Sequence, residues 1–255
     1  MNIVAIIQAR MSSSRLPGKV LMPLAGTPVL GHVVSRIQRC RTINQVVVAT
    51  STDPSDDAIE AWCRLEGVRC HRGSLHDVLD RFQQAAEAEH ADAIVRITAD
   101  CPAIDPEIVD TVVRDFIAGG FDCYGLGGEF PDGLDCTVFA ASALARAWHE
   151  AKLPSEREHV GPYIEKHPEW FHNGALFRFS GQSHHRWTLD EPRDLAFLQA
   201  VFCRLHRPGE APFGADAVLA LLEREPALTR INSLIVRNAG YIKSLAADKA
   251  HHVHA

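Results

Sequence analysis

Basic and hydroxyl-bearing side chains gather in one short loop near the N-terminus. The loop Gln8–Lys19 reads QARMSSSRLPGK and directly follows a run of apolar residues. It contains Arg10, Arg15 and Lys19, together with the serines at 12–14. Cationic side chains neutralise phosphate oxygens, and small residues add hydroxyl and N–H donors. The loop is therefore suited to a polyphosphate, although its charge alone would equally fit a solvated basic loop.

Two common nucleotide-binding fingerprints are absent from this loop. Its spacing does not match the GxxxxGK[ST] pattern of the P-loop, and no GxGxxG follows the first apolar run. Phosphate binding here would therefore need a different arrangement of the same chemical groups.

Two aspartates stand where the chain leaves an apolar run. Asp100 follows AIVRIT, and Asp190 ends the segment HRWTLD. Mg²⁺ is usually held by one or two carboxylates together with substrate oxygens. Taken alone, Asp100 could stabilise a turn and Asp190 could cap the next helix. Because ninety residues separate them, they can share a metal ion only if the fold brings them together.

The first half of the chain alternates between two hydrophobic patterns. Short β-branched apolar runs predict strands, and apolar residues at helical spacing predict helices between them. The predicted strands are Asn2–Ile7, Gln45–Thr50, Val68–His71 and Ala93–Thr98, and the predicted helices are Val29–Arg41, Pro54–Glu66, Ser74–His90 and Pro106–Ala118.

This alternation predicts a doubly wound α/β fold with a mostly parallel, Rossmann-like sheet. Strands that alternate with helices are joined by right-handed crossovers, which cover both faces of the sheet. In such folds the ligand crevice lies beyond the carboxyl ends of the strands. The basic loop and Asp100 both follow strands directly, so we expect them at that crevice.

The middle of the chain interrupts the alternation of predicted strands and helices. The glycine-rich segment 121–135 predicts a loop or small inserted lobe. We expect a single domain over residues 1–255 with this lobe at about 121–182, and the segment 213–247 offers one helix, a short strand candidate and little chemistry. Further predictions are helices at Ala140–Lys152, Glu156–Lys166 and Glu191–Arg204, and strands at Ala175–Phe179 and His185–Asp190.

Composition excludes several classes of protein. The chain of 255 residues is 46% hydrophobic and 23% charged, which argues against disorder, collagen and coiled coil. Its net charge of −6 makes nucleic acid or an anionic membrane an improbable partner. The seven cysteines form no CxxC pair, and the N-terminal apolar run is far shorter than the ~20 residues of a spanning helix. We therefore expect a cytoplasmic protein with reduced thiols.

The segment RMSSSRLPGKVLMPLAGTPVLGHV resembles the signature loop of the nucleotide-sugar pyrophosphorylases. Within them it is similar to the cytidylyltransferases that activate 3-deoxy-2-ulosonic acids, in particular the branch of spore-coat polysaccharide biosynthesis protein F. The resemblance implies a nucleotide-diphospho-sugar transferase fold. It further implies that Arg10, Arg15 and Lys19 bind the triphosphate of CTP and act in catalysis with Asp100, and that Asp100 and Asp190 hold Mg²⁺.

The resemblance also extends to the nucleotide site. RGSLHDVLDRF, residues 72–82, is similar to a family segment that borders the nucleotide, although Arg81 could instead pair with Asp77 along its helix. The family's glutamine shortly before the metal-binding aspartate is absent, because Thr98 and Ala99 stand there, so the base preference is open. The nucleotide-binding residues implied are Gln8, Ala9, Arg10, Ser12, Ser13, Arg15, Lys19, Ser74, Arg81 and Thr98.

Polar residues of the second half are candidates for sugar binding. PDGLDCTVF and SEREHVGPYI resemble the family's sugar-facing segments. Arg157 is the candidate for a sugar carboxylate, with a solvated helix face as the alternative. Adjacent histidines are too few for a zinc site, so His184 contacts substrate or lies on the surface. The candidates are Asp132, Asp135, Arg157, His159 and His184.

These residues predict a Mg²⁺-dependent cytidylyltransferase in which a hydroxyl of an acidic sugar attacks the α-phosphate of CTP and pyrophosphate leaves. The resemblance implies a homodimer, with the mid-chain lobe as the interface. One alternative is a glycosyltransferase of the related GT-A fold, which the missing DxD pair disfavours. The other is a non-catalytic nucleotide-binding homologue, which the retained basic and acidic residues disfavour.

Overall fold

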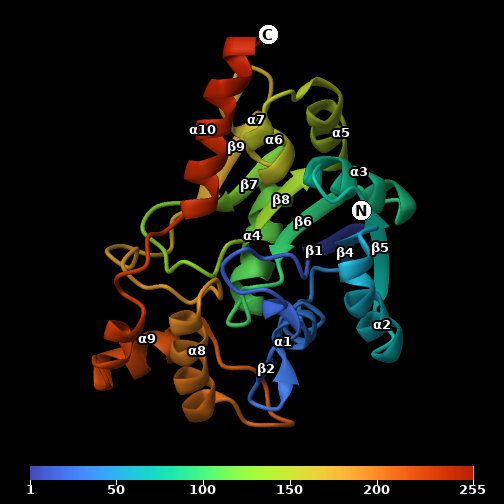
Figure 1. Cartoon of the computed structure of the whole chain (residues 1–255). Helices are drawn as coiled ribbons and strands as arrows, with labels where there is room; N and C mark the ends of the chain where they lie inside the picture. The colour runs from blue at the N-terminus through green and yellow to red at the C-terminus, as the bar shows by residue number, and fades with distance from the viewer. Residues whose placement is uncertain (255) are drawn as a thin grey trace.

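A mostly parallel β-sheet crosses the middle of the molecule (Figure 1). The computed structural model describes residues 1–254, and side chains as far as residue 250. Within that range the sheet has seven strands in the order β5-β4-β1-β6-β8-β7-β9. They are β1 (Ile3–Gln8), β4 (Gln45–Ser51), β5 (Arg69–Gly73), β6 (Ala93–Thr98), β7 (Cys123–Leu126), β8 (Thr137–Ala140) and β9 (Asn173–Leu176); β2 (Pro23–Leu24) and β3 (Thr27–Pro28) form a separate ribbon.

The strand order creates a switch point between β1 and β6. From β1 the chain adds β4 and β5 on one side, and then crosses to place β6 on the other side. All of these neighbours pair in parallel, whereas β8 runs antiparallel to β6 and β7. The predicted doubly wound α/β fold is confirmed. In folds of this kind, ligands bind at the switch point, beyond the carboxyl ends of the strands.

Both faces of β1 are buried. Ile3, Ala5 and Ile7 belong to the core on one face, and Val4 and Ile6 to the core on the other. Burying each of the isoleucine and valine side chains contributes about 1.5–3 kcal/mol, which explains why the strand is apolar throughout. One face is covered by α1 (Val29–Ile37), α2 (Asp57–Leu65), α4 (Pro106–Gly119), α8 (Pro192–Leu205) and α9 (Ala215–Arg224), and the other by α3 (Val78–Ala88), α5 (Ala141–Glu150), α6 (Pro154–His159) and α7 (Pro162–Lys166).

The second half differs from the sequence prediction in three places. The segment predicted as loop or lobe contains β7, and the next strand, β8, was also missed because each has only four residues. The predicted helix Glu156–Lys166 is divided into α6 and α7. Val160 adopts a positive φ of 70°, which ends the first helix, and Pro162 is the first residue of the second. The predicted strand His185–Asp190 is wrong, since only an isolated bridge from Asp132 to Arg186 forms there.

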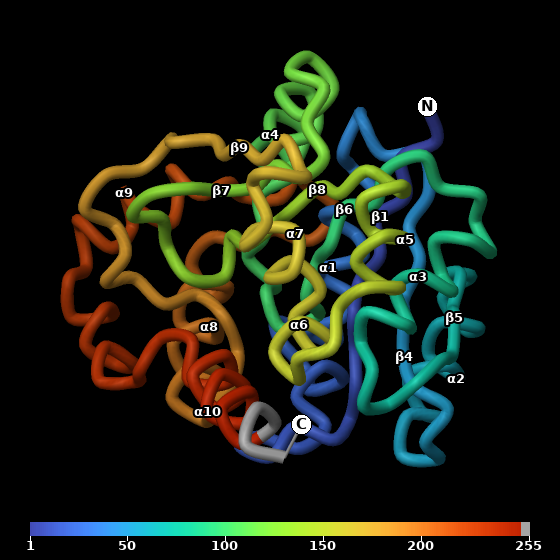
Figure 2. Tube along the Cα trace, turned by 90° about the horizontal axis from the view of Figure 1, so that it is seen from above, coloured from blue at the N-terminus to red at the C-terminus, as the bar shows by residue number. Residues whose placement is uncertain are grey.

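The C-terminal segment holds more helix than the sequence indicates. After α9, a 3-10 turn at Leu228–Ile231 leads to α10 (Ala239–His254). Figures 1 and 2 show α10 beside α6, and Figure 1 shows it at the opposite end of the molecule from α8 and α9. The segment predicted to carry little chemistry therefore reaches the mouth of the switch point. No helix in the described part of the chain is long and apolar enough to cross a membrane.

Candidate active site

The basic loop lies over the switch point, and its conformation is fixed by a backbone hydrogen bond within the loop and by the buried Asp56. β1 and β6 are paired in register so that Gln8 lies beside Thr98. Gly18, at φ 72°, donates its N–H to the carbonyl of Met11 at 2.9 Å and so turns the loop back. The fully buried Asp56 accepts the N–H of Met11 at 2.7 Å. Sequence analysis missed Asp56, because its partner is set by tertiary structure.

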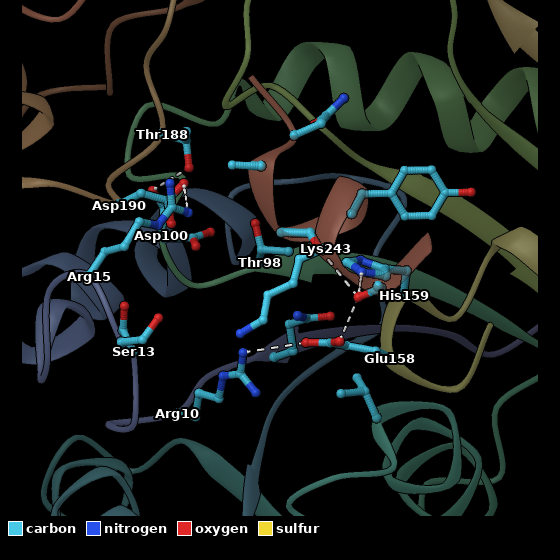
Figure 3. A pocket seen from close by; sticks show the side chains of 18 of the residues that line it. Arg10, Ser13, Arg15, Thr98, Asp100, Glu158, His159, Thr188, Asp190 and Lys243 are labelled. Carbon is cyan, nitrogen blue, oxygen red and sulfur yellow. Dashed lines mark hydrogen bonds and ion pairs between the residues drawn. The ribbon is translucent and has the colours of Figure 1, made fainter. Parts of the chain in front are cut away.

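The structure brings the two candidate metal ligands to one point. Lys19 Nζ lies 2.6 Å from Asp100 Oδ2 and 2.8 Å from Asp190 Oδ1. The backbone N–H of Leu189 donates to the Asp100 carbonyl at 2.8 Å and fixes the two segments side by side. Arg15 reaches Asp190 from the loop at 2.9 Å. The two carboxylates therefore enclose a position that a cation, the ammonium group of Lys19, already occupies. Figure 3 shows Asp100 and Asp190 together, with Arg15 beside them.

This ion cluster stays charged at neutral pH. Burial alone would raise the pKa of Asp100, but the charge and hydrogen bond of Lys19 lower it to about 2. The pKa of Asp190 is also lowered, because Lys19 and Arg186 outweigh its burial and the repulsion from Asp100. Burial lowers the pKa of Lys19, yet the two carboxylates raise it above its ordinary value. Both carboxylates are thus ionised throughout the physiological range.

Arg186 organises the acidic side of the site and was not predicted. Its guanidinium donates to Asp132 at 2.7 Å, to Asp190 at 2.8 Å and to Asp194 at 2.9 Å. Asp194 is fully buried and also accepts the backbone N–H groups of Asp190 and Glu191. One arginine thereby fixes the Asp190 carboxylate from behind. Burial raises the pKa of Asp132 to about 6, despite its contact with Arg186.

Gly133 permits the close approach that places this segment, and we expect Gly133→Ala to be strongly destabilising. Its φ is +106°, and an added Cβ would lie 2.6 Å from the carbonyl carbon of Trp187 and 2.7 Å from the nitrogen of Thr188. The backbone conformation and the clash each cost about 1–3 kcal/mol. Urea unfolding measures the loss. Gly181→Ala is the matched control, because it shares the positive φ of 68° but has open space around its Cβ.

A cavity of about 630 Å³ lies above the switch point. The basic loop forms one wall and α6 with α10 forms another (Figure 3). Predicted residues that line it are Gln8, Ala9, Arg10, Ser13, Arg15, Lys19, Arg81, Thr98, Asp100, Asp132, His159 and Asp190. The sequence thus indicated most of one wall and the two carboxylates that are candidates to hold a metal ion.

Some predicted ligand residues do not line the cavity. Ser12 is exposed, and Ser74 Oγ accepts the N–H of Asp77 at 3.1 Å. Asp135 Oδ2 turns to the N–H of Gly133 at 2.9 Å. Ser74 and Asp135 thus cap turns next to the site, so these residue types, which suggested ligand binding, serve the local backbone.

The remaining two predicted sugar ligands point elsewhere as well. Arg157 donates through Nε to Asp77 at 2.9 Å and through its terminal nitrogen to the carbonyl of Trp148 at 2.6 Å, which ties α6 to α3. His184 is exposed and contacts the carbonyl of Gly181. Because Asp77 pairs with Arg157, the alternative pairing of Asp77 with Arg81 is wrong.

Arg81 instead donates to the Ser74 carbonyl at 2.6 Å, and burial together with the nearby charge of Arg10 lowers its pKa to about 10. Gln8 Oε1 is buried without a hydrogen-bond partner at the base of the cavity. A buried acceptor without a partner costs free energy until a donor reaches it. Gln8 is therefore placed to accept a hydrogen bond from a ligand.

A polar chain joins the loop to the C-terminal helix. Arg10 lies 3.6 Å from Glu158, Ser244 donates its hydroxyl to Glu158 at 2.8 Å, and His159 Nε2 lies 3.0 Å from the same hydroxyl oxygen. Burial lowers the pKa of His159, so the imidazole is neutral and donates to Ser244. Of this set only Arg10 and His159 were predicted, because α10 has a weakly amphipathic sequence that does not indicate which residues face a ligand.

The donor set fits a hard divalent cation. The described residues contain no group of three or more His, Cys, Asp or Glu side chains that could hold a metal ion alone. Two ionised carboxylates that already enclose an ammonium group match Mg²⁺, which usually keeps water and substrate oxygens as its other ligands. Cys101, beside Asp100, is buried, and burial raises the pKa of its thiol well above the ordinary value, so it is a packing residue and not a nucleophile.

The α/β fold, with a basic loop and two carboxylates at its switch point, is typical of enzymes that act on nucleotides. Residues 4–203 match the family model of the cytidylyltransferases, and the chain belongs to that family. It is therefore a nucleotidyltransferase. The match ends before α9 and α10, so the helix that closes the cavity lies outside the matched range.

Three similar proteins agree with this assignment. The spore coat polysaccharide biosynthesis protein SpsF of Bacillus subtilis is 35% identical over 234 residues, which cover 88% of this chain and 95% of that protein. A 3-deoxy-manno-octulosonate cytidylyltransferase of Geobacter sulfurreducens is 38% identical over 115 residues, 44% of each chain. The structure of a cytidylyltransferase from Leptospira borgpetersenii has 31% identity and a TM-score of 0.86, covering 93% of this chain and 100% of that one.

Proposed function

We propose that this enzyme joins CTP to an acidic 2-keto-3-deoxy sugar, in a reaction that requires Mg²⁺, to give a CMP-sugar and pyrophosphate. The observation that carries the proposal is the pair of ionised carboxylates, Asp100 and Asp190, that enclose one cation position beside the basic loop. The names of two relatives, which refer to spore-coat polysaccharide and to 3-deoxy-manno-octulosonate, support a role in surface polysaccharide synthesis.

In the proposed reaction the sugar hydroxyl oxygen forms a bond to the α-phosphorus, the bond from that phosphorus to the β-phosphate oxygen breaks, and the hydroxyl proton passes to solvent. Bound by Asp100 and Asp190, Mg²⁺ would neutralise phosphate charge and favour ionisation of the hydroxyl. Arg10, Arg15 and Lys19 bind the triphosphate and stabilise the charge that gathers on departing pyrophosphate. Arg186 holds Asp190 in place.

Selection of cytosine is assigned to Gln8. Its buried, unpaired Oε1 accepts a hydrogen bond, which the 4-amino group of cytosine can donate. Uracil offers a carbonyl at that position, which the Gln8 amide could pair with only by turning over to present its NH2 group. In this proposal the base lies at the inner end of the loop, where Gln8 is paired with Thr98 in the sheet.

The test is pyrophosphate release with Mg²⁺, each of the four ribonucleoside triphosphates, and a panel of eight- and nine-carbon 2-keto-3-deoxy acids. We expect release only with CTP together with one class of acid. Silence with every acid, with CTP binding retained, would favour a glycosyltransferase or a non-catalytic homologue. Absence of CTP binding would refute the proposal outright.

The same preparation tests the proposed homodimer. The proposed interface is the lobe at about 121–182, where Phe177 is 75% exposed and follows the edge strand β9. Light scattering should give twice the mass of one chain. Phe177→Ser should lower the apparent mass at the same concentration, whereas replacement of the exposed Leu65 on α2 should not.

A further inference from the structure

The C-terminal helix α10 brings an unpaired cation into the cavity. Lys243 lines the cavity together with Asn238, Tyr241 and Ser244, and Figure 3 shows its side chain extending from α10 into the open space. Among the ion pairs of the described residues, none involves Lys243. An amine that faces a cavity without a counter-ion is suited to an anionic ligand.

Buried hydrogen bonds fix the position of α10. Ser155 of α6 donates its N–H to Asp248 Oδ1 at 2.9 Å and its hydroxyl to Asp248 Oδ2 at 2.6 Å, and both residues are buried. One turn before Asp248, Ser244 bonds to Glu158 and His159. Lys243 is adjacent to this anchored serine, so its backbone has a defined place in the wall.

Most other cations of the cavity have acidic partners, and the exception, Arg81, is buried and donates to the Ser74 carbonyl. Lys19 is shared by Asp100 and Asp190, Arg15 contacts Asp190, and Arg186 is surrounded by acids. Arg10 faces Glu158. Arg157, the candidate that the sequence offered for a sugar carboxylate, is bound to Asp77 on the far side of α6. A carboxylate that entered beside His159 would therefore meet Lys243 as the available cation.

We propose that Lys243 binds the carboxylate of the sugar acid, so that α10 forms the wall that selects acidic sugars. The inference rests on the proposed function. It follows from position, because Lys243 is adjacent to Ser244, which bonds to His159 on the α6 wall of the cavity, and from charge, because the basic loop already brings three cations to the triphosphate. Asn238 and Tyr241 lie on the same wall and supply polar groups for the sugar hydroxyls.

The test compares Lys243→Ala with Lys249→Ala, a matched control on the same helix that is exposed and does not line the cavity. Substrates are CTP and whichever of 3-deoxy-manno-octulosonate or N-acetylneuraminate the wild-type enzyme accepts. Loss of one charge-assisted contact should raise the KM for the sugar acid about 10- to 100-fold. The KM for CTP should stay within about twofold, and Lys249→Ala should behave as wild type.

A neutral analogue identifies the group that Lys243 binds. In this analogue a hydroxymethyl group replaces the carboxylate, and its inhibition constant is measured against the sugar acid. We expect wild type and Lys243→Ala to bind the analogue equally, because the neutral analogue forms no ion pair with Lys243. A rise in the KM for CTP, or an equal loss for acid and analogue, would overturn the inference. If the wild-type enzyme accepts no sugar acid, the proposed function fails and the inference fails with it; wild-type turnover with an unaffected variant refutes the inference alone.

Discussion

Asp100→Asn is expected to lower the rate of pyrophosphate release by at least about 10³-fold. The amide keeps the size of the carboxylate but removes its charge, so the cation position is left with Asp190 as its ionised ligand. Removing one preorganised electrostatic group at a reacting phosphate costs about 10²–10³-fold, and a metal ligand contributes more because the ion itself is lost. Single-turnover measurement at saturating CTP separates this loss from weaker binding.

Asp135→Asn is the matched control for this variant. Asp135 is an aspartate close to the same edge of the sheet, but its carboxylate accepts the N–H of Gly133 and does not line the cavity. We expect its activity to remain within a few fold of wild type. If Asp100→Asn retained more than a tenth of the wild-type rate, the assignment of Asp100 as a metal ligand would be wrong.

The position of the basic loop could be predicted from the sequence, because it depends only on the strand that directly precedes the loop. A wholly apolar strand followed by a basic loop fixes where that loop must lie in a parallel sheet. Asp100 could be placed by the same reasoning, since β6 ends two residues before it. Asp190 was placed for a partly incorrect reason. Its segment is not a strand, and it reaches the site because Leu189 bonds to the carbonyl of Asp100.

Residues whose partners are distant in sequence could not be assigned. Arg157 has the charge that a carboxylate ligand needs, but Asp77, eighty residues earlier, takes it. Arg186 looked like one polar residue among several, and its importance comes from three acids that the fold gathers around it. Lys243 lies on a helix that the sequence did not connect with the site. The sequence shows that each of these three side chains is charged. Which acidic group lies beside it, or that none does, depends on tertiary packing.

Lys19→Met should destabilise the protein at neutral pH and much less in acid. In the wild type the folded-state pKa of Asp100, about 2, lies below its ordinary value of 3.8. Such a group stabilises the fold above its unfolded pKa, and the contribution of about 2 kcal/mol is lost as pH falls from about 4 towards 2. Without Lys19, Asp100 is a partly buried carboxylate with no cation beside it, while Asp190 keeps Arg15 and Arg186. Burial and repulsion by Asp190 then raise the pKa of Asp100. The ionised carboxylate of Asp100 therefore destabilises the folded state at neutral pH instead of stabilising it.

The expected free energy of unfolding of Lys19→Met is therefore about 2–4 kcal/mol below wild type at pH 7. The difference should shrink as pH falls from about 6 to 4, because protonation relieves the unpaired charge in the variant while Asp100 of the wild type stays ionised. Urea unfolding across this range measures it, with Lys152→Met as the exposed-lysine control. Because a divalent cation can take the place of the ammonium group, millimolar Mg²⁺ should stabilise Lys19→Met more than wild type. If the difference in the free energy of unfolding did not change with pH, Lys19 would stabilise the fold through packing. The proposal that Asp100 and Asp190 form a cation site would then be wrong.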